Sequence, residues 1–504
     1  MNNIVSLTPK LGYFLLISFG VIMILITRFF GRWKNYASIK GFLVAGRDVK
    51  GWLGATSIAA SWVWAPALFI SSQMAYQKGL AGLFWFVFPN IIALLLYIFL
   101  APKIREKLPY GYTLPQWIRF RLQSEKVHKI YLFPYFFYQL MAVVVQLFVG
   151  GNLVSLLTGI PLINAMIIMA STVLIYTSIS GLESSFVTDF VQMFFIILAI
   201  FIVVPWSIHA AGGMTVLISG FGGVTGNFRN VFDPSVAFSF GIVTSIGLIS
   251  GAISDQQYWQ RAFAIKKKNL ISSFVFGAII FAIVPLLLSS LGFLAANESL
   301  SISLPAGVDA SMIGVASVSK LLPNFGIVLF VFMLISALYS TLDSGLIAAS
   351  SLYVTDVVKY SDNEKKLLIK IDKNEELTNE EKLLAKRLNK RGVKNSRKAM
   401  LYLTVLGLLV SLGINYFPGL ELKHLWWIFN TVAACVIVPT VLSLYYDHLD
   451  DRGVFWGVLV SFFVGLPLFV YGNIIDNAKW IVGSSIFIIC VSTAFCLIVP
   501  KRKV

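Results

Sequence analysis

The stretch from Val331 to Asp356, VFMLISALYSTLDSGLIAASSLYVTD, constrains the fold most. It is long and apolar enough to span a membrane, yet it carries Asp343 near its middle. An ionised side chain facing lipid at that depth costs about 3 kcal/mol or more. Such a carboxylate therefore faces a cavity or a polar partner. We expect an all-α bundle of membrane helices with a polar interior.

One face of this stretch is rich in oxygen atoms. Ala337, Ser340, Thr341 and Ser344 recur at i, i+3, i+4 and i+7, so they share a helix face. Hydroxyl and carbonyl oxygens are the ligands that hard cations such as Na⁺ prefer. Small and hydroxyl residues also pack membrane helices together. The face alone leaves an ion site and a packing surface open.

The rest of the chain has the composition of a polytopic membrane protein. Of its 504 residues, 58% are hydrophobic and 12% are charged. Thirteen apolar segments are long enough to cross a bilayer. They cover residues 9–30, 51–78, 81–101, 128–151, 161–180, 184–208, 235–260, 270–295, 322–357, 398–416, 424–446, 453–472 and 479–499.

The distribution of basic residues predicts the orientation of these spans. With the N-terminus outside, the cytoplasmic connections and tail hold 34 of the 40 Lys and Arg residues, and the opposite side holds six. This is the asymmetry of the positive-inside rule. The net charge of +17 is then a topology signal, and we expect no nucleic-acid partner. We predict a multi-pass protein of the cell membrane with a cytoplasmic C-terminus.

Two spans carry signs of a broken helix. Pro66 follows the WVWA stretch in the middle of span two, and Gly241, Gly247 and Gly251 interrupt span seven. Proline removes a backbone hydrogen bond, and a break within the membrane is tolerated only where the freed groups find a partner. Interruptions in corresponding positions of two halves are typical of inverted-repeat transporters. Ordinary kinks and glycine packing are the alternative.

Four motifs resemble those of the sodium:solute symporter superfamily: FLVAGRDVKGWLGATSIAAS, SGLESSFVTDFVQ, DQQYWQRAFAIKK and SALYSTLDSGLIAASS. The resemblance implies a LeuT-type architecture, in which two inverted five-helix repeats cover 51–208 and 235–446. A first span and linker, 1–50, precede them, and two spans and a basic tail, 453–504, follow. A charged insert, 359–397, is expected to form a short cytoplasmic hairpin or a mobile helix. It lacks nucleotide and kinase motifs.

The resemblance also implies a main sodium site of three carbonyl and two hydroxyl oxygens. Counted without gaps from the first motif, these belong to Ala60, Val63, Ala337, Ser340 and Thr341. A register shifted by one residue would instead place the carbonyls of the broken helix at Ala59 and Trp62. Na⁺ is the only cofactor that we expect.

A second sodium site is implied by Asp189, Ser340, Asp343 and Ser344. Asp343 stands where the family has a hydroxyl, which leaves open a strengthened sodium site or a proton carrier. Asp189 also lies in the first turn of its span, where a carboxylate simply stabilises a helix N-terminus. Two further charged residues, Asp255 and Arg261, are expected to act as gate or ion-pair residues rather than as ligands.

The solute site is expected between the two broken spans and their neighbours. Candidate residues are Trp62, Trp64, Gln73, Thr244, Ser245, Ser250 and Asn430, with Asn90 and Trp426 beside them. The middle of each core span lacks Lys and Arg, and two indoles crowd the pocket, which favours a small polar solute. The segment SWVWAPALFISSQMAY resembles the urea-type branch of the superfamily. The tryptophans alternatively serve as packing and as anchors at the membrane interface.

We therefore predict a Na⁺-coupled symporter that imports a small polar organic solute, urea-like or amino-acid-like, by alternating access. One alternative is a symporter of the same fold that is coupled to H⁺. Another is a sensor that binds solute without transporting it. An enzyme is not expected. The predicted partners are the solute, Na⁺ and the lipid bilayer, and a monomer is our working expectation for the assembly.

Overall fold

The computed structural model describes residues 7–31, 38–305, 307–414, 416 and 421–499. The basic tail expected on the cytoplasmic side lies outside these residues. The described chain is built from helices, with one isolated parallel bridge between Val49 and Ile265. The all-α architecture expected from the sequence is therefore confirmed.

The first half of the chain contains two short helices and seven longer ones. Their bounds are α1 Pro9–Gly31, α2 Ile39–Val44, α3 Gly51–Trp62, α4 Ala65–Leu95, α5 Tyr97–Lys107, α6 Leu114–Leu122, α7 Glu125–Thr158, α8 Leu162–Ser180 and α9 Leu182–Ala210. A 3₁₀ turn, η1, covers Ala45–Arg47.

The second half begins with two short helices, α10 Met214–Ser219 and α11 Pro234–Val236. The remaining helices are α12 Ile242–Ser254, α13 Gln256–Ala264, α14 Leu270–Ala295, α15 Ile313–Leu321, α16 Asn324–Leu352, α17 Asp362–Lys373, α18 Asn379–Ile414, α19 Leu422–Tyr445, α20 Asp451–Val460, α21 Leu466–Ile474 and α22 Ala478–Ile498. The described residues include three π-helical segments: η3 Ala237–Gly241 joins α11 to α12, η7 Tyr353–Val357 ends α16, and η8 Ser461–Gly465 joins α20 to α21.

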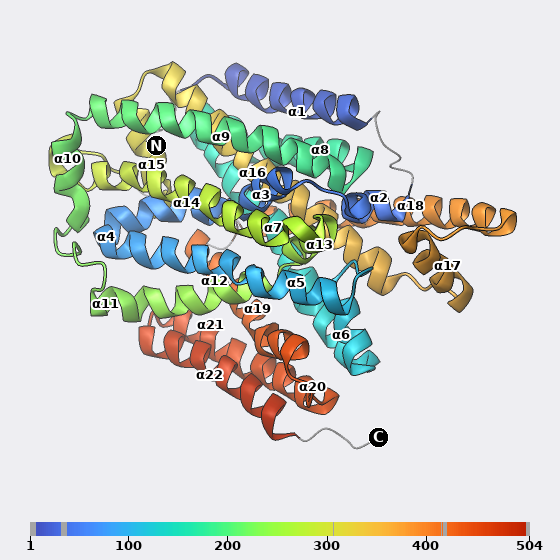
Figure 1. The fold of residues 1–504 in the computed structure, drawn as a ribbon. Helices are drawn as coiled ribbons and strands as arrows, with labels where there is room; N and C mark the ends of the chain where they lie inside the picture. Colours follow the sequence, from blue (N-terminus) through green and yellow to red (C-terminus); the bar gives the residue numbers. More distant parts are fainter. Residues whose placement is uncertain (1–6, 32–37, 306, 415, 417–420, 500–504) are drawn as a thin grey trace.

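Twelve helices of the described chain are long and apolar enough to cross a membrane. One of them, Ala65–Lys107, has 43 residues, about twice what a span requires. It turns back at Lys78 and Gly79, where φ of Gly79 is 52° and ψ is −145°. Figure 1 shows the two arms of α4 on either side of this turn. Dividing the helix there turns twelve spans into thirteen, the expected number.

The first broken helix is formed by α3 and α4. Helix α3 ends at Trp62, Val63 and Trp64 are non-helical, and α4 starts at Ala65. Pro66 occupies the first turn of α4, where its missing N–H is not needed for an intrahelical bond. The ring also disfavours helical backbone before it, so the break precedes the proline as the sequence indicates.

The second broken helix is formed by α12 and α13, and its break lies at Asp255 rather than at the expected glycines. The Asp255 carboxylate caps α13 by accepting from the Gln257 N–H at 2.9 Å. Gly247 and Gly251 lie within the continuous helix α12. A Cβ on Gly251 would lie 2.2 Å from Asn430 Oδ1, so this glycine permits close helix approach rather than a break.

The broken helices occupy the centre of the bundle. Helix α4 packs on α12 and α14, α3 packs on α9 and α14, and α16 lies against α7, α9 and α18. Helices α20 to α22 flank one side of the bundle, and α1 and α9 flank the opposite side (Figure 1). The site described below therefore lies inside a shell of complete helices.

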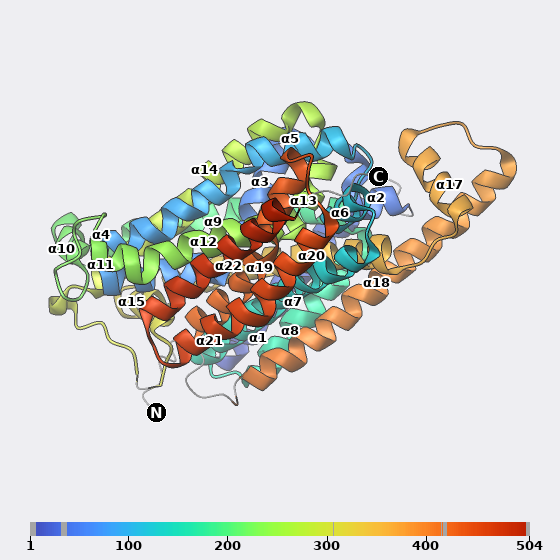
Figure 2. The ribbon, with the colours of Figure 1, turned by 90° about the horizontal axis from the view of Figure 1, so that it is seen from below.

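The charged insert forms a helical hairpin that projects from one end of the bundle (Figure 2). A capping box of Ser361 and Glu364 starts α17, and Asn374 ends it in a left-handed conformation. The second arm, α18, has 36 residues and continues without a break into the membrane span that ends at Ile414. The insert is thus rigidly joined to the bundle through α18.

Candidate ion and solute sites

The break between α3 and α4 faces the hydroxyl-bearing side of α16. Ser340 Oγ donates to the Ala60 carbonyl at 2.9 Å, and Thr341 Oγ1 donates to the Val63 carbonyl at 3.1 Å. All four residues are buried, as is Ala337 one turn before Ser340. The structure thus brings together the residues named from the sequence for the main sodium site.

These contacts involve the carbonyls of one of the two registers. The hydroxyls reach the carbonyls of Ala60 and Val63, the pair given by the count without gaps. The Trp62 carbonyl instead accepts from the Trp64 N–H at 2.9 Å, within the turn itself. The Ala65 N–H, left free by the break, donates to Gln146 Oε1 at 3.0 Å. The turn is held from both sides by buried hydrogen bonds.

The chemistry of this turn suits a small hard cation. Each of the two hydroxyl oxygens lies one hydrogen bond from one of the two carbonyl oxygens. A hydroxyl can rotate its hydrogen away and offer a lone pair. Oxygen donors without a fixed negative charge suit Na⁺. The fifth predicted ligand, Ala337, is buried one turn before Ser340 on α16. Coordination by these atoms stays a prediction.

A second polar cluster lies between α9, α13 and α16. Asp189 Oδ2 accepts from Ser57 at 2.5 Å and from Arg261 Nη2 at 3.0 Å, and Ser185 Oγ lies 3.2 Å away. Arg261 also donates to Ser344 Oγ at 2.8 Å. The second oxygen of Asp189, Oδ1, is buried and has no hydrogen-bond partner among the described residues.

Asp343 is surrounded by hydroxyl groups. Tyr176 donates to Oδ2 at 2.9 Å and Ser185 donates to Oδ1 at 3.0 Å, and Thr188 and Ser344 lie at 3.3 and 3.2 Å. Ser185 lies within hydrogen-bond distance of both carboxylates, so it bridges Asp343 and Asp189. Hydrogen bonds from these hydroxyl groups favour the charged form of the carboxylate, whereas its complete burial opposes that form.

The charges of this cluster do not cancel. Two carboxylates, Asp189 and Asp343, share one guanidinium, that of Arg261. Ionised together they leave one net negative charge, which burial makes costly. One further cation or one proton would neutralise the cluster. Ser340, expected here as well, instead bonds the Ala60 carbonyl, and Arg261 pairs with Asp189 rather than with Asp255.

A small cavity lies beside the break, enclosed by aromatic rings. Its volume is about 20 Å³, enough for about one water molecule. It is lined by Trp62, Trp64, Pro66, Ala67, Phe86, Asn90, Tyr138, Leu248, Trp426, Phe429 and Asn430. These residues come from α4 and its break, α7, α12 and α19, the region where the sequence predicts the solute.

The polar groups of the cavity are all uncharged. Tyr138 Oη donates to Asn430 Oδ1 at 3.3 Å, and Asn430 Nδ2 donates to the Trp426 carbonyl at 2.9 Å. The indole of Trp64 stacks on Phe429 with ring centroids 5.3 Å apart. The buried Trp62 Nε1–H has no acceptor in the part of the chain that the structure describes. It is therefore a donor available to a guest.

Not all predicted solute residues reach this cavity. Trp62, Trp64, Asn90, Trp426 and Asn430 line it, whereas the four others, Gln73, Thr244, Ser245 and Ser250, are absent from its described lining. Tyr138 of α7 and Phe429 of α19 also line the cavity, although the sequence does not single them out. Both lie in helices rich in aromatic residues, so only the folded chain shows which rings face the cavity.

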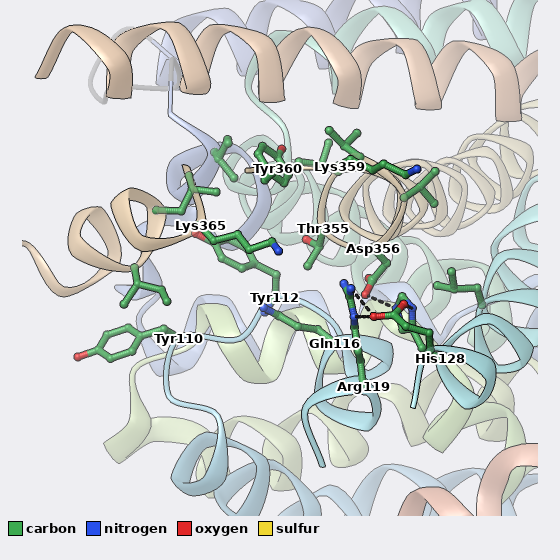
Figure 3. Close-up of a pocket in the computed structure, with 18 of the residues that line it drawn as sticks. Tyr110, Tyr112, Gln116, Arg119, His128, Thr355, Asp356, Lys359, Tyr360 and Lys365 are labelled. Carbon is green, nitrogen blue, oxygen red and sulfur yellow. Dashed lines mark hydrogen bonds and ion pairs between the residues drawn. The ribbon is translucent and has the colours of Figure 1, made fainter. Parts of the chain in front are cut away.

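A larger pocket of about 730 Å³ opens where the hairpin meets α6 and α7 (Figure 3). Two buried carboxylates line it. Asp356 accepts from Thr113 at 2.7 Å and faces His128 Nε2 at 2.9 Å. Asp372 accepts from Tyr112 at 2.8 Å; burial raises the pKa of Asp372, and the neighbouring Arg47 opposes that rise. The contact of Asp372 joins the hairpin to the loop before α6, and those of Asp356 join the end of α16 to α6 and α7.

The curated relatives of the chain include several proteins named as urea transporters. The urea-proton symporter DUR3 of Oryza sativa subsp. japonica is 26% identical over 390 residues, which cover 70% of this chain and 53% of the relative. The urea active transporter of Saccharomyces cerevisiae is 22% identical over 464 residues, which cover 86% and 59%. The chain spans little more than half the length of these relatives.

Solved structures share the fold over nearly the whole chain. A Na⁺-coupled sialic acid symporter in a substrate-bound outward-open state matches with a TM-score of 0.75 at 14% identity, covering 98% of this chain and 99% of that one. Mhp1, a nucleobase-cation-symport-1 family transporter, matches with a TM-score of 0.53 at 12% identity, covering 91% and 95%. These likenesses confirm the LeuT-type fold.

The family follows from the sequence match. A model of the sodium:solute symporter family matches residues 42–375, which include both broken helices, the hydroxyl-bearing face of α16 and the carboxylate cluster. The match covers well over half of the chain, and the relatives confirm the expected urea-type branch. The chain belongs to the sodium:solute symporter family.

Proposed function

We propose that this protein is a cation-coupled symporter for urea or a similarly small, neutral amide, with Na⁺ bound at the break between α3 and α4. The observation that carries the proposal is the position of Trp62. Its neighbours Ala60 and Val63 direct their carbonyls to the α16 hydroxyls, while Trp62 itself lines the solute cavity. Ion and solute would thus bind to one four-residue turn, Ala60–Val63.

This shared turn supports coupling between the two ligands. An ion at the carbonyls of Ala60 and Val63 fixes the backbone that positions the Trp62 indole. Solute at the indole in turn fixes the carbonyls. Because such coupling is reciprocal, each ligand raises the affinity for the other by the same factor. A rocking motion of the broken helices then carries both across the membrane.

The lining of the cavity supports a neutral, flat solute. No charged side chain lines it among the described residues, so an ionic solute would lack a counter-charge. Trp62 offers an N–H to a carbonyl oxygen, and Asn90 and Asn430 offer amide groups. Urea has one carbonyl and two amino groups. Since it is larger than one water molecule, its binding requires the walls to move apart.

The carboxylate cluster favours a second candidate, coupling to H⁺. Asp189 and Asp343 share a single guanidinium, so one proton on either carboxylate would neutralise the cluster. The name of the rice relative, a urea-proton symporter, describes that kind of coupling. In this version Asp343, surrounded by hydroxyl groups, carries the proton. The two candidates agree on fold and solute and differ in the ion.

Uptake of labelled urea into proteoliposomes tests both candidates. An inward Na⁺ gradient at equal pH should drive accumulation, and replacing Na⁺ with choline should abolish it. An inward H⁺ gradient without Na⁺ should drive accumulation only if the second candidate holds. Binding of urea without accumulation under either gradient would contradict transport and favour a sensor.

We also propose the cell membrane as the site of action, with the N-terminus outside and the C-terminus in the cytoplasm. The support is the excess of Lys and Arg on alternate connections. Cysteine labelling at Lys320→Cys and Lys366→Cys, expected on opposite sides, checks this orientation. A membrane-impermeant reagent applied to intact cells should label the first position alone.

A further inference from the structure

A row of lysines follows α18 out of the membrane. Lys382, Lys386, Lys390, Lys394 and Lys398 recur at every fourth position, and all five side chains are exposed. Like charges four residues apart destabilise a helix. None of the five side chains forms an ion pair or a hydrogen bond with a described residue. The row therefore weakens α18 unless something outside the chain neutralises it.

The five lysines line one groove of about 1070 Å³ between α18 and the end of α8. Arg397 adds a sixth cation, and its guanidinium donates to the Ser178 carbonyl at 2.8 Å. Apolar side chains complete the groove, among them Ile179, Val393 and Leu401. No carboxylate belongs to its described lining. The groove therefore combines strong positive charge with an apolar floor.

The exposed apolar residues next to the groove indicate where it lies relative to the bilayer. Just beyond Lys398, α18 exposes large apolar side chains to the outside: Leu401, Tyr402, Val405, Leu406 and Leu409. This is the lipid-facing surface of a membrane span. Lys390, Lys394 and Lys398 cover about 12 Å along the helix axis directly above it. They lie near the layer in which phospholipid headgroups reside.

We propose that the groove binds anionic phospholipid of the leaflet on this side of the membrane. The phosphate-bearing headgroup contacts Lys390, Lys394 and Lys398, and the upper part of an acyl chain covers Ile179 and Leu401. A polybasic segment next to a membrane span attracts anionic lipid in this way. The apolar floor favours a lipid over a soluble anion, because a soluble anion leaves that floor exposed.

The test is binding of phosphatidylglycerol and phosphatidylcholine to the purified full chain, measured by native mass spectrometry. The unmodified protein should bind phosphatidylglycerol more tightly. Lys390→Gln, Lys394→Gln and Lys398→Gln together should weaken phosphatidylglycerol binding about tenfold or more and leave phosphatidylcholine unchanged. The corresponding triple change to Arg, which keeps the charges, should retain the preference and shows that the helix itself is intact.

A matched control removes three other exposed lysines that lie at span ends on the same predicted side: Lys126, Lys267 and Lys268. This triple change to Gln should keep the lipid preference. An equal loss in both triple-Gln variants would overturn the proposal, because it would reflect net charge rather than this groove. Competition by free glycerol phosphate or by a polyglutamate peptide at the concentration of the lipid would also overturn it, in favour of a soluble anion or an acidic protein segment.

Discussion

The guanidinium of Arg261 lies 3.0 Å from the carboxylate of Asp189, and neither side chain is exposed to solvent. Arg261 belongs to the second half of one broken helix, α13, and Asp189 belongs to α9, in the other predicted repeat. The pair therefore joins the two repeats at a point one hydrogen bond from the α16 hydroxyl of Ser344. Motion of α13 relative to α9 therefore changes the charge balance around Asp189.

The first prediction concerns this ion pair. Arg261→Gln leaves two buried carboxylates without a cation and should lower the free energy of unfolding by about 3–5 kcal/mol. Adding Asp189→Asn returns the cluster to one net negative charge, so the double variant should recover much of the lost stability. Thermal unfolding of the three proteins in detergent measures this. A double variant as unstable as Arg261→Gln alone would show that charge balance is not the cause.

The second prediction concerns the break. Ser340→Ala combined with Thr341→Ala removes both hydroxyl oxygens that face the Ala60 and Val63 carbonyls. The Na⁺ concentration for half-maximal uptake should rise roughly tenfold or more, since each lost oxygen contact contributes about 1 kcal/mol. Sodium-dependent uptake into proteoliposomes measures the change.

Ser336 provides the control for that experiment. Its hydroxyl lies on the same helix but bonds the Phe332 carbonyl of its own helix at 2.8 Å. Ser336→Ala should therefore leave the Na⁺ dependence unchanged. If the double variant at Ser340 and Thr341 behaves like this control, the main ion does not bind at the break.

The third prediction separates the two roles of Asp343. Asp343→Asn keeps the shape of the side chain but removes its charge and its proton-carrying capacity. If the cluster binds a second Na⁺, the measured number of Na⁺ ions per solute should fall by one. If Asp343 carries a proton, the dependence of uptake on external pH should be lost instead. Retention of ratio, Na⁺ affinity and pH profile would remove Asp343 from the coupling machinery.

The fourth prediction concerns the solute. Trp62→Phe keeps an aromatic ring but removes the unpartnered indole N–H, so the KM for urea should rise about fivefold to tenfold. Trp85→Phe is a matched control, because its Nε1 is also buried without a partner but lies outside the described lining of the cavity. Equal effects of the two substitutions would argue against a contact between Trp62 and the solute.

The sequence predicts the contacts between α16 and the break because two independent patterns converge there. The helical spacing of Ser340 and Thr341 places both hydroxyls on one face, and the break is signalled by Pro66. Both signals come from residues that are close in the sequence, and the structure shows both the shared face and the break. The contacts with Ala60 and Val63 then follow from the register of the motif rather than from any long-range argument.

Long-range relationships were less accessible. Asp189 and Arg261 are 72 positions apart in the sequence, and no local pattern pairs them. The break in span seven was assigned to glycines, whereas an aspartate that caps the following helix forms it. Glycine in a helix signals close packing as often as a break, and only the position of Asn430 against Gly251 shows which applies.

The two hydroxyl bonds at the break also bear on how a cation at the proposed ion site would leave. In the structure, the hydrogens of Ser340 and Thr341 occupy the carbonyls of Ala60 and Val63. A departing Na⁺ would therefore be replaced by two hydrogen bonds, together worth about 2 kcal/mol. The two hydroxyl groups that would hold the ion would also close the turn behind it, so release would leave neither carbonyl without a donor.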